Sequence, residues 1–145
     1  MSTYNGEKYI NQQLDSIFRN ERNYEIELYV RDDGSKDRTI EYLRNYGIKH
    51  AVPIEVNEGE NVGSAESFLM ALRECPKADY YAFCDQDDVW KPEKLKRAIE
   101  KIREIEKDDL PVLYNSDYQL VDAQLNPLPE SNHKSTTTFN AAILS

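Results

Sequence analysis

The sequence has few cysteines and no surplus of basic residues, and each shortage excludes a class of protein. Only two cysteines occur among 145 residues, Cys75 and Cys84, and they form neither a CxxC pair nor a disulfide framework. We therefore expect two reduced thiols in a cytoplasmic protein, with Cys84 buried. The 18 basic residues are outnumbered by 27 acidic ones, and the resulting net charge of −9 argues against a nucleic-acid-binding surface.

Long apolar runs and glycine-rich phosphate loops are absent as well. No stretch approaches the roughly 20 apolar residues that span a bilayer, and the N-terminus lacks the basic-then-apolar pattern of a secretory signal. Neither GxGxxG nor GxxxxGK[ST] occurs, so a generic nucleotide-binding α/β domain has little support. His50 and His133 have no partners at metal-ligand spacing. The 39% apolar and 31% charged residues are typical of a globular domain.

The most informative stretch is an aromatic run that ends at three carboxylates. Residues 80–84 predict a buried strand, which Asp85, Asp87 and Asp88 follow. Ligands of open α/β sheets bind beyond the carboxyl ends of strands, and clustered carboxylates there repel one another unless a cation or ligand neutralises them. Oxygen ligands suit Mg²⁺ or Mn²⁺, often shared with phosphates, so we predict a metal–phosphate site. Helix capping ahead of Pro92 is the alternative.

Strands and helices alternate along the chain. The periodicity predicts further strands over 25–31, 52–56, 111–114 and 118–123, and helices over 7–19, from 35 or 37 to 46, 65–74 and 92–107. Gly47 and Pro76 are expected to stop the second and third helices. The third helix is expected to bury Ala65, Phe68, Leu69 and Leu72. This order predicts an α/β fold, a three-layer sandwich with a mostly parallel central sheet, in one domain over residues 1–145.

A second strand end is also acidic. The predicted strand 25–31 leads directly into Asp32, Asp33 and Gly34. Because the carboxyl ends of parallel strands meet at one edge of a sheet, we expect this group to lie near Asp85 and its neighbours. The glycine- and asparagine-rich loop 57–64 either lets the backbone approach a ligand or is a plain connection. Two carboxylate clusters at one edge favour a ligand site over helix capping.

Four motifs in this order resemble family 2 glycosyltransferases of the A-type fold. They occupy residues 2–5, 31–37, 61–63 and 84–92, and the last is most similar to the bacterial branch that includes rhamnosyltransferases. The resemblance implies a Rossmann-like half that binds a UDP- or dTDP-linked nucleotide-diphospho-sugar with Mn²⁺ or Mg²⁺. It also implies inverting transfer of the sugar to a saccharide or lipid-linked acceptor in cell-surface polysaccharide synthesis. The implied location is cytoplasmic, peripheral at the inner face of the membrane.

On the base side, the resemblance assigns nucleotide-sugar contacts to three residues. Ser2 and Tyr4 match positions that line the base pocket. Asp33 matches the carboxylate that accepts a hydrogen bond from the base N3–H. For the neighbouring Asp32 we expect turn and capping duty instead.

On the phosphate side, Asp85 matches the carboxylate near the ribose and the metal, and Asp87 matches the residue that ligates Mn²⁺ or Mg²⁺ on the diphosphate. Asn61 matches a position near the nucleotide. Helix capping is the preferred interpretation for Asp88. Trp90 either floors the donor pocket or packs against the next helix, and the pattern leaves both open.

Two features depart from the family pattern. Residues 2–5 read as a loop that follows a strand, so we expect the first strand to be missing. In the family, the general base and much of the acceptor half lie beyond this length, so we assign no catalytic residue up to Ser145. We therefore expect a truncated donor-binding half of an enzyme; the alternative is a non-catalytic nucleotide-sugar-binding fragment that acts through a partner chain. An unpaired strand edge also predicts a homo-oligomer.

Overall fold

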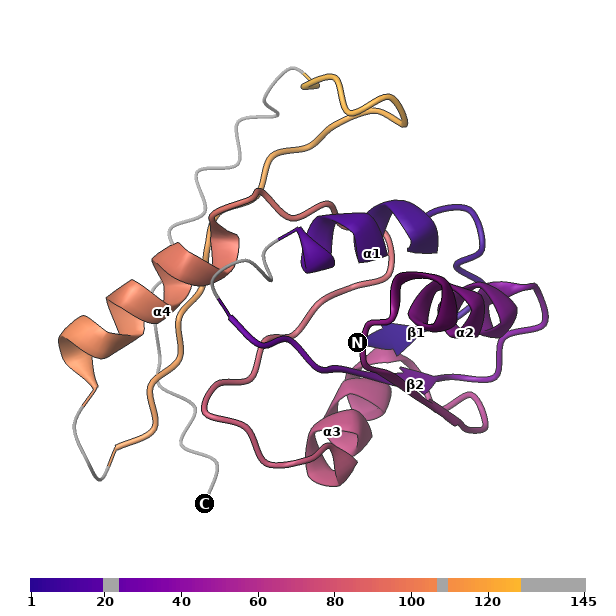
Figure 1. The fold of residues 1–145 in the computed structure, drawn as a ribbon, viewed down its shortest axis with the longest axis horizontal. Helices are drawn as coiled ribbons and strands as arrows, with labels where there is room; N and C mark the ends of the chain where they lie inside the picture. Colours follow the sequence, from indigo (N-terminus) through magenta and orange to yellow (C-terminus); the bar gives the residue numbers. More distant parts are fainter. Residues whose placement is uncertain (20–23, 107–109, 129–145) are drawn as a thin grey trace. The chain divides into compact units, whose positions relative to one another are not determined.

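The computed structural model describes residues 1–19, 24–106 and 110–128, and the chain divides into two compact units, Met1–Tyr114 and Asn115–Ser145. His133 lies outside the described residues. The elements of the first unit are β1 (Ser2–Thr3), α1 (Ile10–Phe18), β2 (Leu28–Asp32), α2 (Thr39–His50), β3 (Ile54–Glu58), α3 (Ser64–Glu74) and α4 (Lys94–Ile105) (Figure 1).

The three strands form one parallel sheet in the order β1-β2-β3. Ser2 pairs with Arg31, and Leu28 pairs with Ile54. The Met1 amino group extends the contact, because it donates a 2.7 Å hydrogen bond to the carbonyl of Tyr29. The loop predicted for Ser2 and Thr3 is therefore wrong: these residues form β1.

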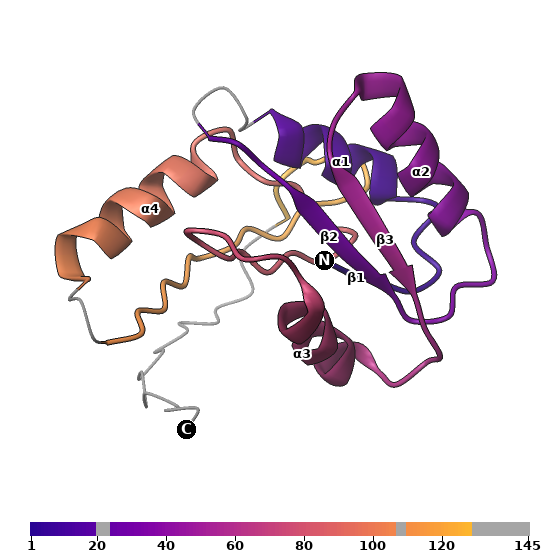
Figure 2. The ribbon, with the colours of Figure 1, turned by 60° about the horizontal axis from the view of Figure 1, so that its bottom comes forward.

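Helices cover both faces of this sheet, as Figure 2 shows: α1 and α2 lie on one side and α3 on the other. The alternation of side chains along β2 explains the arrangement. Leu28 and Val30 belong to the core on the α1/α2 side. Tyr29 Oη and Arg31 Nη1 donate to Glu74 and Ser67 of α3 on the opposite side. The predicted layered α/β fold with a parallel sheet is confirmed.

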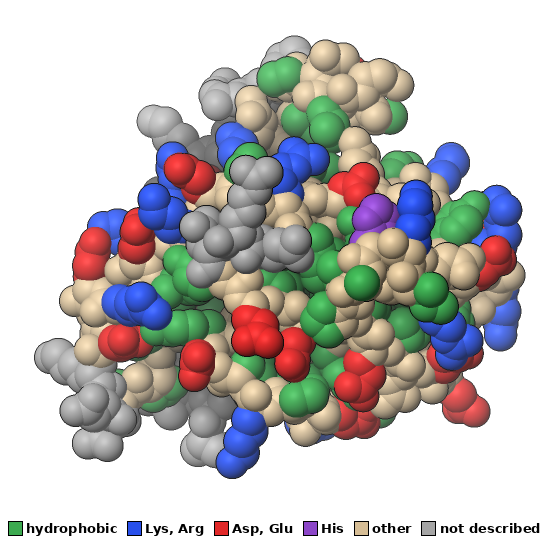
Figure 3. Space-filling model, viewed as in Figure 1, with side chains coloured by type: hydrophobic (Ala, Val, Ile, Leu, Met, Phe, Trp, Pro, Cys, Tyr) green, Lys and Arg blue, Asp and Glu red, His purple; other side chains and the backbone are tan. Residues whose placement is uncertain are grey.

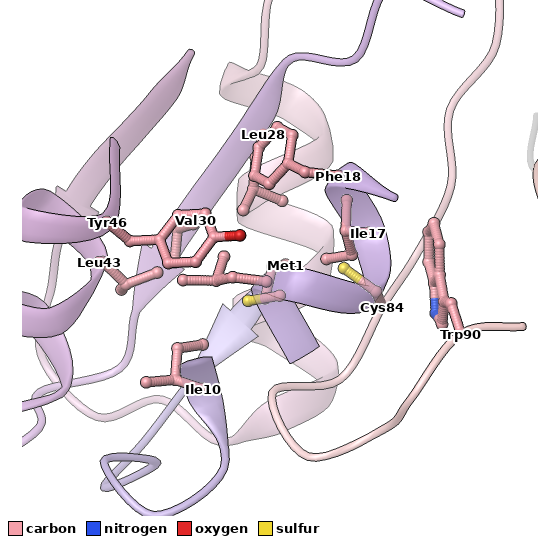
Figure 4. Close-up of a cluster of buried hydrophobic side chains, with 11 residues drawn as sticks. Met1, Ile10, Ile17, Phe18, Leu28, Val30, Leu43, Tyr46, Cys84 and Trp90 are labelled. Carbon is pink, nitrogen blue, oxygen red and sulfur yellow. The ribbon is translucent and has the colours of Figure 1, made fainter. Parts of the chain in front are cut away.

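One continuous apolar core lies between the sheet, α1 and α2 (Figure 4). Its buried members are Met1, Ile10, Leu14, Ile17, Phe18, Leu28, Val30, Leu43, Tyr46, Cys84 and Trp90. Burial raises the pKa of the Cys84 thiol, which keeps it protonated and unreactive. The predicted burial of this cysteine is confirmed, and Cys75 is likewise a free thiol.

The aromatic run over residues 80–84 is not a strand, contrary to the prediction. Tyr81 and Phe83 each keep about half of their surface exposed, at 52% and 53%. A strand needs neighbouring backbone donors and acceptors, and β1 supplies only two residues for pairing. Residues 111–114 also lack strand structure, and the described part of the second unit holds a single antiparallel pair, Val121 with Pro127.

The helix ends partly differ from the prediction. Helix α2 continues through Gly47 and stops at Ala51, whose φ is 52°. A Cβ at Gly47 would meet only ordinary contacts, such as Cβ of Ile54 at 3.6 Å, so the helix passes through this position without steric conflict. Helix α3 ends before Pro76 as predicted, but its buried residues are Ser67 and Ala71 and not the larger apolar ones. Small side chains let α3 lie close to the sheet.

Helix α4 carries a mixed-charge surface, seen as interspersed red and blue side chains in Figure 3. Glu93 and Arg97 form an ion pair one helical turn apart, with 3.0 Å between Oε2 and Nη2. Ile99 is the buried residue of the helix, whereas Ile105 at its end is exposed. Within the ranges that the structure describes, no helix is long and apolar enough to cross a membrane.

Candidate functional site

Four segments of the first unit line one open pocket of about 300 Å³. They are the end of β1 with the residue after it, the residue after β2, the loop before α3 with its first turns, and residues 85–87. The lining residues are Ser2, Thr3, Tyr4, Asp33, Asn61, Gly63, Ser64, Phe68, Asp85, Gln86 and Asp87. All six residues predicted to contact nucleotide-sugar or metal are among them. The structure therefore brings both acidic motifs to one place, although residues 80–84 form no strand.

Asp33 is a buried carboxylate with three strong donors. Its side chain accepts the backbone N–H groups of Val62 and Gly63, each at 2.9 Å, and Nη1 of Arg31 at 2.6 Å. Burial by itself raises the pKa of Asp33, but the donors and the guanidinium charge outweigh it, so the pKa lies below the ordinary 3.8. The pocket thus contains a carboxylate that stays ionised at neutral pH.

The lowered pKa of Asp33 predicts a loss of stability in acid. Because the folded pKa lies below the unfolded one, this contribution is complete above the unfolded value and is lost as pH falls through the folded value. We expect the free energy of unfolding, measured in urea from neutral pH to about pH 2, to decrease on the acidic limb. Asp33→Asn should reduce the slope of that limb. An unchanged slope in this variant would show that Asp33 is not a source of the pH dependence.

Arg31 lies next to Asp33 and hydrogen-bonds several segments around the pocket. It is 4% exposed, and besides Asp33 it donates to Ser67 Oγ at 3.0 Å and to the Glu60 carbonyl at 3.1 Å. The side chain therefore connects β2, the loop before α3 and α3 itself. Sequence reasoning missed this role, although a cationic residue within a predicted strand, on the face opposite Val30, was the available signal.

A glycine makes room for this arginine. A Cβ on Gly59 would lie 3.0 Å from the Cζ of Arg31, which is held by its hydrogen bonds. We expect Gly59→Ala to cost about 1–3 kcal/mol in the free energy of unfolding, measured by chemical denaturation. Gly47→Ala is the matched control, because its Cβ would meet only ordinary contacts from 3.4 Å outward and would favour the helix. Equal effects of the two substitutions would contradict the steric account.

Asp32 fixes the turn that presents Asp33. Its Oδ1 accepts the hydroxyls of Thr3 and Ser35, and its Oδ2 accepts the backbone N–H groups of Gly34 and Ser35. Gly34 has a φ of 83°, in the left-handed region that favours glycine. The turn duty predicted for Asp32 is confirmed.

The loop after β1 forms another wall of the pocket. Asn5 has a φ of 50°; its N–H donates to Ser35 Oγ, and its Oδ1 accepts the Lys36 N–H, both at 2.8 Å. This anchoring leaves the Tyr4 side chain 48% exposed. Ser2 is more enclosed, since its hydroxyl donates to Ser67 Oγ at 2.6 Å. The Tyr4 ring is therefore accessible to a ligand while the neighbouring backbone of Asn5 stays hydrogen-bonded.

Two carboxylates occupy the remaining wall. Burial, followed by the charges of Asp88 and Asp87, raises the pKa of Asp85 above 3.8. The positive charge of the Met1 amino group opposes this rise without cancelling it, so negative charge is concentrated here. Asp85 and Asp87 carry carboxylate oxygens, but the described residues contain no group of three or more His, Cys, Asp or Glu side chains placed to hold a metal ion.

Two other predictions for this segment have clear outcomes. The capping role predicted for Asp88 is wrong, because α4 begins at Lys94 and its N-cap residue is Glu93. The alternatives for Trp90 are settled in favour of packing. Trp90 is 6% exposed within the core (Figure 4), it does not line the pocket, and its backbone N–H donates to Ser16 Oγ of α1.

Gln86 is a pocket residue that sequence reasoning did not select. Its side-chain amide forms two hydrogen bonds with the backbone of Tyr4, 82 residues away. The only available sequence signal was its position between two carboxylates. A second pocket of about 130 Å³ lies between α3 and residues 80–83, but its lining is mainly apolar and holds no carboxylate pair.

Comparison with known proteins identifies the family of this chain. The sequence profile described as Glycosyl transferase family 2 matches residues 1–138. The dTDP-rhamnosyl transferase RfbG of Shigella flexneri is 32% identical over 104 residues, which are 69% of this chain and 36% of that protein. The poly(ribitol-phosphate) beta-N-acetylglucosaminyltransferase TarS of Staphylococcus aureus is 32% identical over 109 residues, 74% of this chain and 19% of TarS.

The solved structures give the same answer. The crystal structure of S. aureus TarS 1–349 in complex with UDP-GlcNAc superposes with a TM-score of 0.61 and 31% identity, over 71% of this chain and 30% of that one. The fold is the A-type glycosyltransferase fold of TarS, and the chain spans between about a fifth and about a third of the length of the relatives it matches. This chain belongs to glycosyl transferase family 2.

Proposed function

We propose that this chain is the donor-binding part of an inverting, metal-dependent glycosyltransferase. It would transfer a sugar from a UDP- or dTDP-linked donor to a saccharide or lipid-linked acceptor in cell-surface polysaccharide synthesis. One observation carries the proposal: a single pocket contains the ionised Asp33 together with Asp85 and Asp87. A nucleotide-diphospho-sugar has complementary chemistry, with hydrogen-bond donors on its base and a diphosphate that binds cations.

Asp33 is suited to recognising the base. Three donors already fix its orientation, and Oδ2 accepts only the Gly63 N–H among them, so a further lone pair remains for a ligand. Uracil and thymine both carry an N3–H that can donate to it, whereas cytosine carries an acceptor at the same position. Tyr4 and Ser2 line the same pocket, where the half-exposed ring of Tyr4 offers a face on which a base can stack.

The acidic wall is suited to a shared metal ion. Asp85 and Asp87 would hold Mn²⁺ or Mg²⁺, with diphosphate oxygens completing the coordination, since such ions are commonly bound by one or two carboxylates plus substrate phosphates. The raised pKa of Asp85 fits a site where burial and neighbouring carboxylates outweigh the positive charge of the Met1 amino group. When bound, the ion would stabilise the negative charge that develops on the leaving nucleoside diphosphate. The residues present therefore fit the cofactor.

The chemistry on the acceptor side needs a further group. In-line attack by an acceptor hydroxyl requires a general base to take its proton. We assign this role to none of the described carboxylates, because Asp33, Asp85 and Asp87 are committed to the donor. The contribution of this part of the chain is to bind and orient the donor.

The relatives indicate which nucleobases to consider for the donor of this chain. One is a dTDP-rhamnosyl transferase, and another is seen with UDP-GlcNAc, so both thymine and uracil occur among their donors. Asp33 should accept N3–H from either base and reject cytosine.

Base discrimination is therefore a direct test of the proposal. We expect UDP or dTDP to bind at least about tenfold more tightly than CDP, each measured by calorimetry in excess Mn²⁺, because CDP leaves the buried carboxylate without a donor. CDP matches UDP in sugar and charge, which makes it the control ligand. Equal affinities for all three nucleotides would contradict the assignment of Asp33 to the base.

A further inference from the structure

We propose that Gln86 is a positioning residue. Its side chain holds the wall of the pocket that contains Tyr4 in a fixed position relative to the wall that contains Asp85 and Asp87, and we call this contact the lock. The inference rests on the proposed function, because it concerns how the same pocket holds a nucleoside diphosphate. Gln86 is flanked by the two carboxylates proposed to bind metal, and it contacts the Tyr4 loop. Its side-chain amide thus bonds residues 85–87 to that loop.

The contact is a two-point amide pair. The Tyr4 N–H donates to Gln86 Oε1 at 2.9 Å, and Gln86 Nε2 donates to the Tyr4 carbonyl at 3.0 Å. Both backbone groups of one residue are thus satisfied by one side chain, as in a pair of neighbouring strands. The pairing fixes both the position and the orientation of the Tyr4 peptide relative to residues 85–87.

Gly6 leaves space for this pair. A Cβ on Gly6 would lie 2.6 Å from Cδ of Gln86, closer than packed atoms approach. The φ of Gly6 lies outside the left-handed region, so alanine can adopt its backbone conformation. Its own N–H and carbonyl bonds, to Thr39 and from the first turn of α1, do not involve a side chain at this position. Gly6→Ala should therefore displace the Gln86 amide and little else.

The lock should affect affinity most for a ligand that contacts both walls of the pocket. A nucleoside diphosphate contacts Tyr4 and Asp33 through its base, and Asp85 and Asp87 through the metal-bound phosphates. If the two walls are held in a fixed relative position before binding, less conformational entropy is lost when the ligand binds. If the amide pair is lost, the walls move separately and the metal contributes less to nucleotide affinity. Because the Tyr4 contacts are exposed, water can satisfy its backbone after that loss, and the fold should survive.

The test is the gain in affinity that Mn²⁺ gives to UDP and dTDP, measured as the ratio of calorimetric Kd values without and with the metal. We expect Gln86→Ala and Gly6→Ala each to reduce this ratio by about fivefold to tenfold. The double variant should behave like either single one, because both remove the same contact. Gln12→Ala, an exposed glutamine of α1, is the matched control and should keep the full ratio.

Thermal unfolding separates positioning from stability. A melting temperature of Gln86→Ala close to that of Gln12→Ala, with a reduced ratio, supports the lock. An unchanged ratio in Gln86→Ala, or additive losses in the double variant, would overturn it while leaving the proposed function intact. A ratio that falls only in proportion to a lower melting temperature would also overturn it. Failure of the unmodified protein to bind either nucleotide would instead overturn the proposed function, and the lock with it.

Discussion

Asp33→Ala is expected to lower the free energy of unfolding by about 3–5 kcal/mol, the cost of leaving a buried charge unpaired. Arg31 and Asp33 are 4% and 3% exposed at their side chains, with 2.6 Å between Nη1 and Oδ1. Without the carboxylate, the guanidinium would lose its counter-charge, and the N–H groups of Val62 and Gly63 would lose their acceptor. Such a loss is a large part of the about 5–15 kcal/mol that stabilises an ordinary domain.

Urea denaturation of a small set of variants measures this effect. Asp33→Asn keeps an acceptor oxygen for the backbone donors but removes the charge, so we expect an intermediate loss. Combining Asp33→Ala with Arg31→Met should cost less than the sum of the two single substitutions, because the double variant leaves no unpaired charge. A loss below about 1 kcal/mol for Asp33→Ala would mean that the pair behaves like an exposed one.

Asp87→Asn is expected to give the largest loss of ligand binding. The proposed ion would be held by only two protein carboxylates, and asparagine removes one of the charges while keeping the shape of the side chain. Loss of a direct ligand should weaken Mn²⁺ binding in the presence of UDP or dTDP by at least the about 10- to 100-fold known for outer-shell changes. Free Mn²⁺ measured by electron paramagnetic resonance during titration gives this affinity directly.

The control for Asp87→Asn is an equal change of charge elsewhere. Asp79 is an exposed carboxylate ahead of the aromatic run and does not line the pocket. Asp79→Asn should leave Mn²⁺ affinity unchanged, because exposed charges at a distance are largely screened by salt. If both variants lost the same affinity, the metal would be responding to net charge and not to a ligand at position 87.

The pattern of apolar and polar residues along the chain was sufficient to predict β2 and α1. The apolar–polar alternation of β2 and the helical stripe of α1 each reflect one face packing on the core, so neighbouring residues carry the information. The meeting of Asp33 with Asp85 and Asp87 followed from one topological rule, that parallel strands end at the same edge. That conclusion survived even though residues 80–84 form no strand.

Other features depend on partners distant in the chain. The aromatic run has the composition of a strand, but a strand also needs a paired neighbour, and β1 offers only Ser2 and Thr3. The hydrogen bond of Arg31 to the Glu60 carbonyl joins residues 29 positions apart, and the contact of Gln86 with Tyr4 joins residues 82 positions apart. Side-chain amides and guanidinium groups carry no periodicity, so their partners became visible only in the folded chain.

The most direct test of a metal-bridged nucleotide pocket is calorimetric titration of the protein with UDP and with dTDP, each with Mn²⁺ and with the metal removed by chelation. The account predicts that at least one of the two nucleotides binds, and that removing Mn²⁺ weakens it by about tenfold or more, because Asp85 and Asp87 would then repel the diphosphate. Equal affinity with and without the metal, or no binding of either nucleotide, would contradict it.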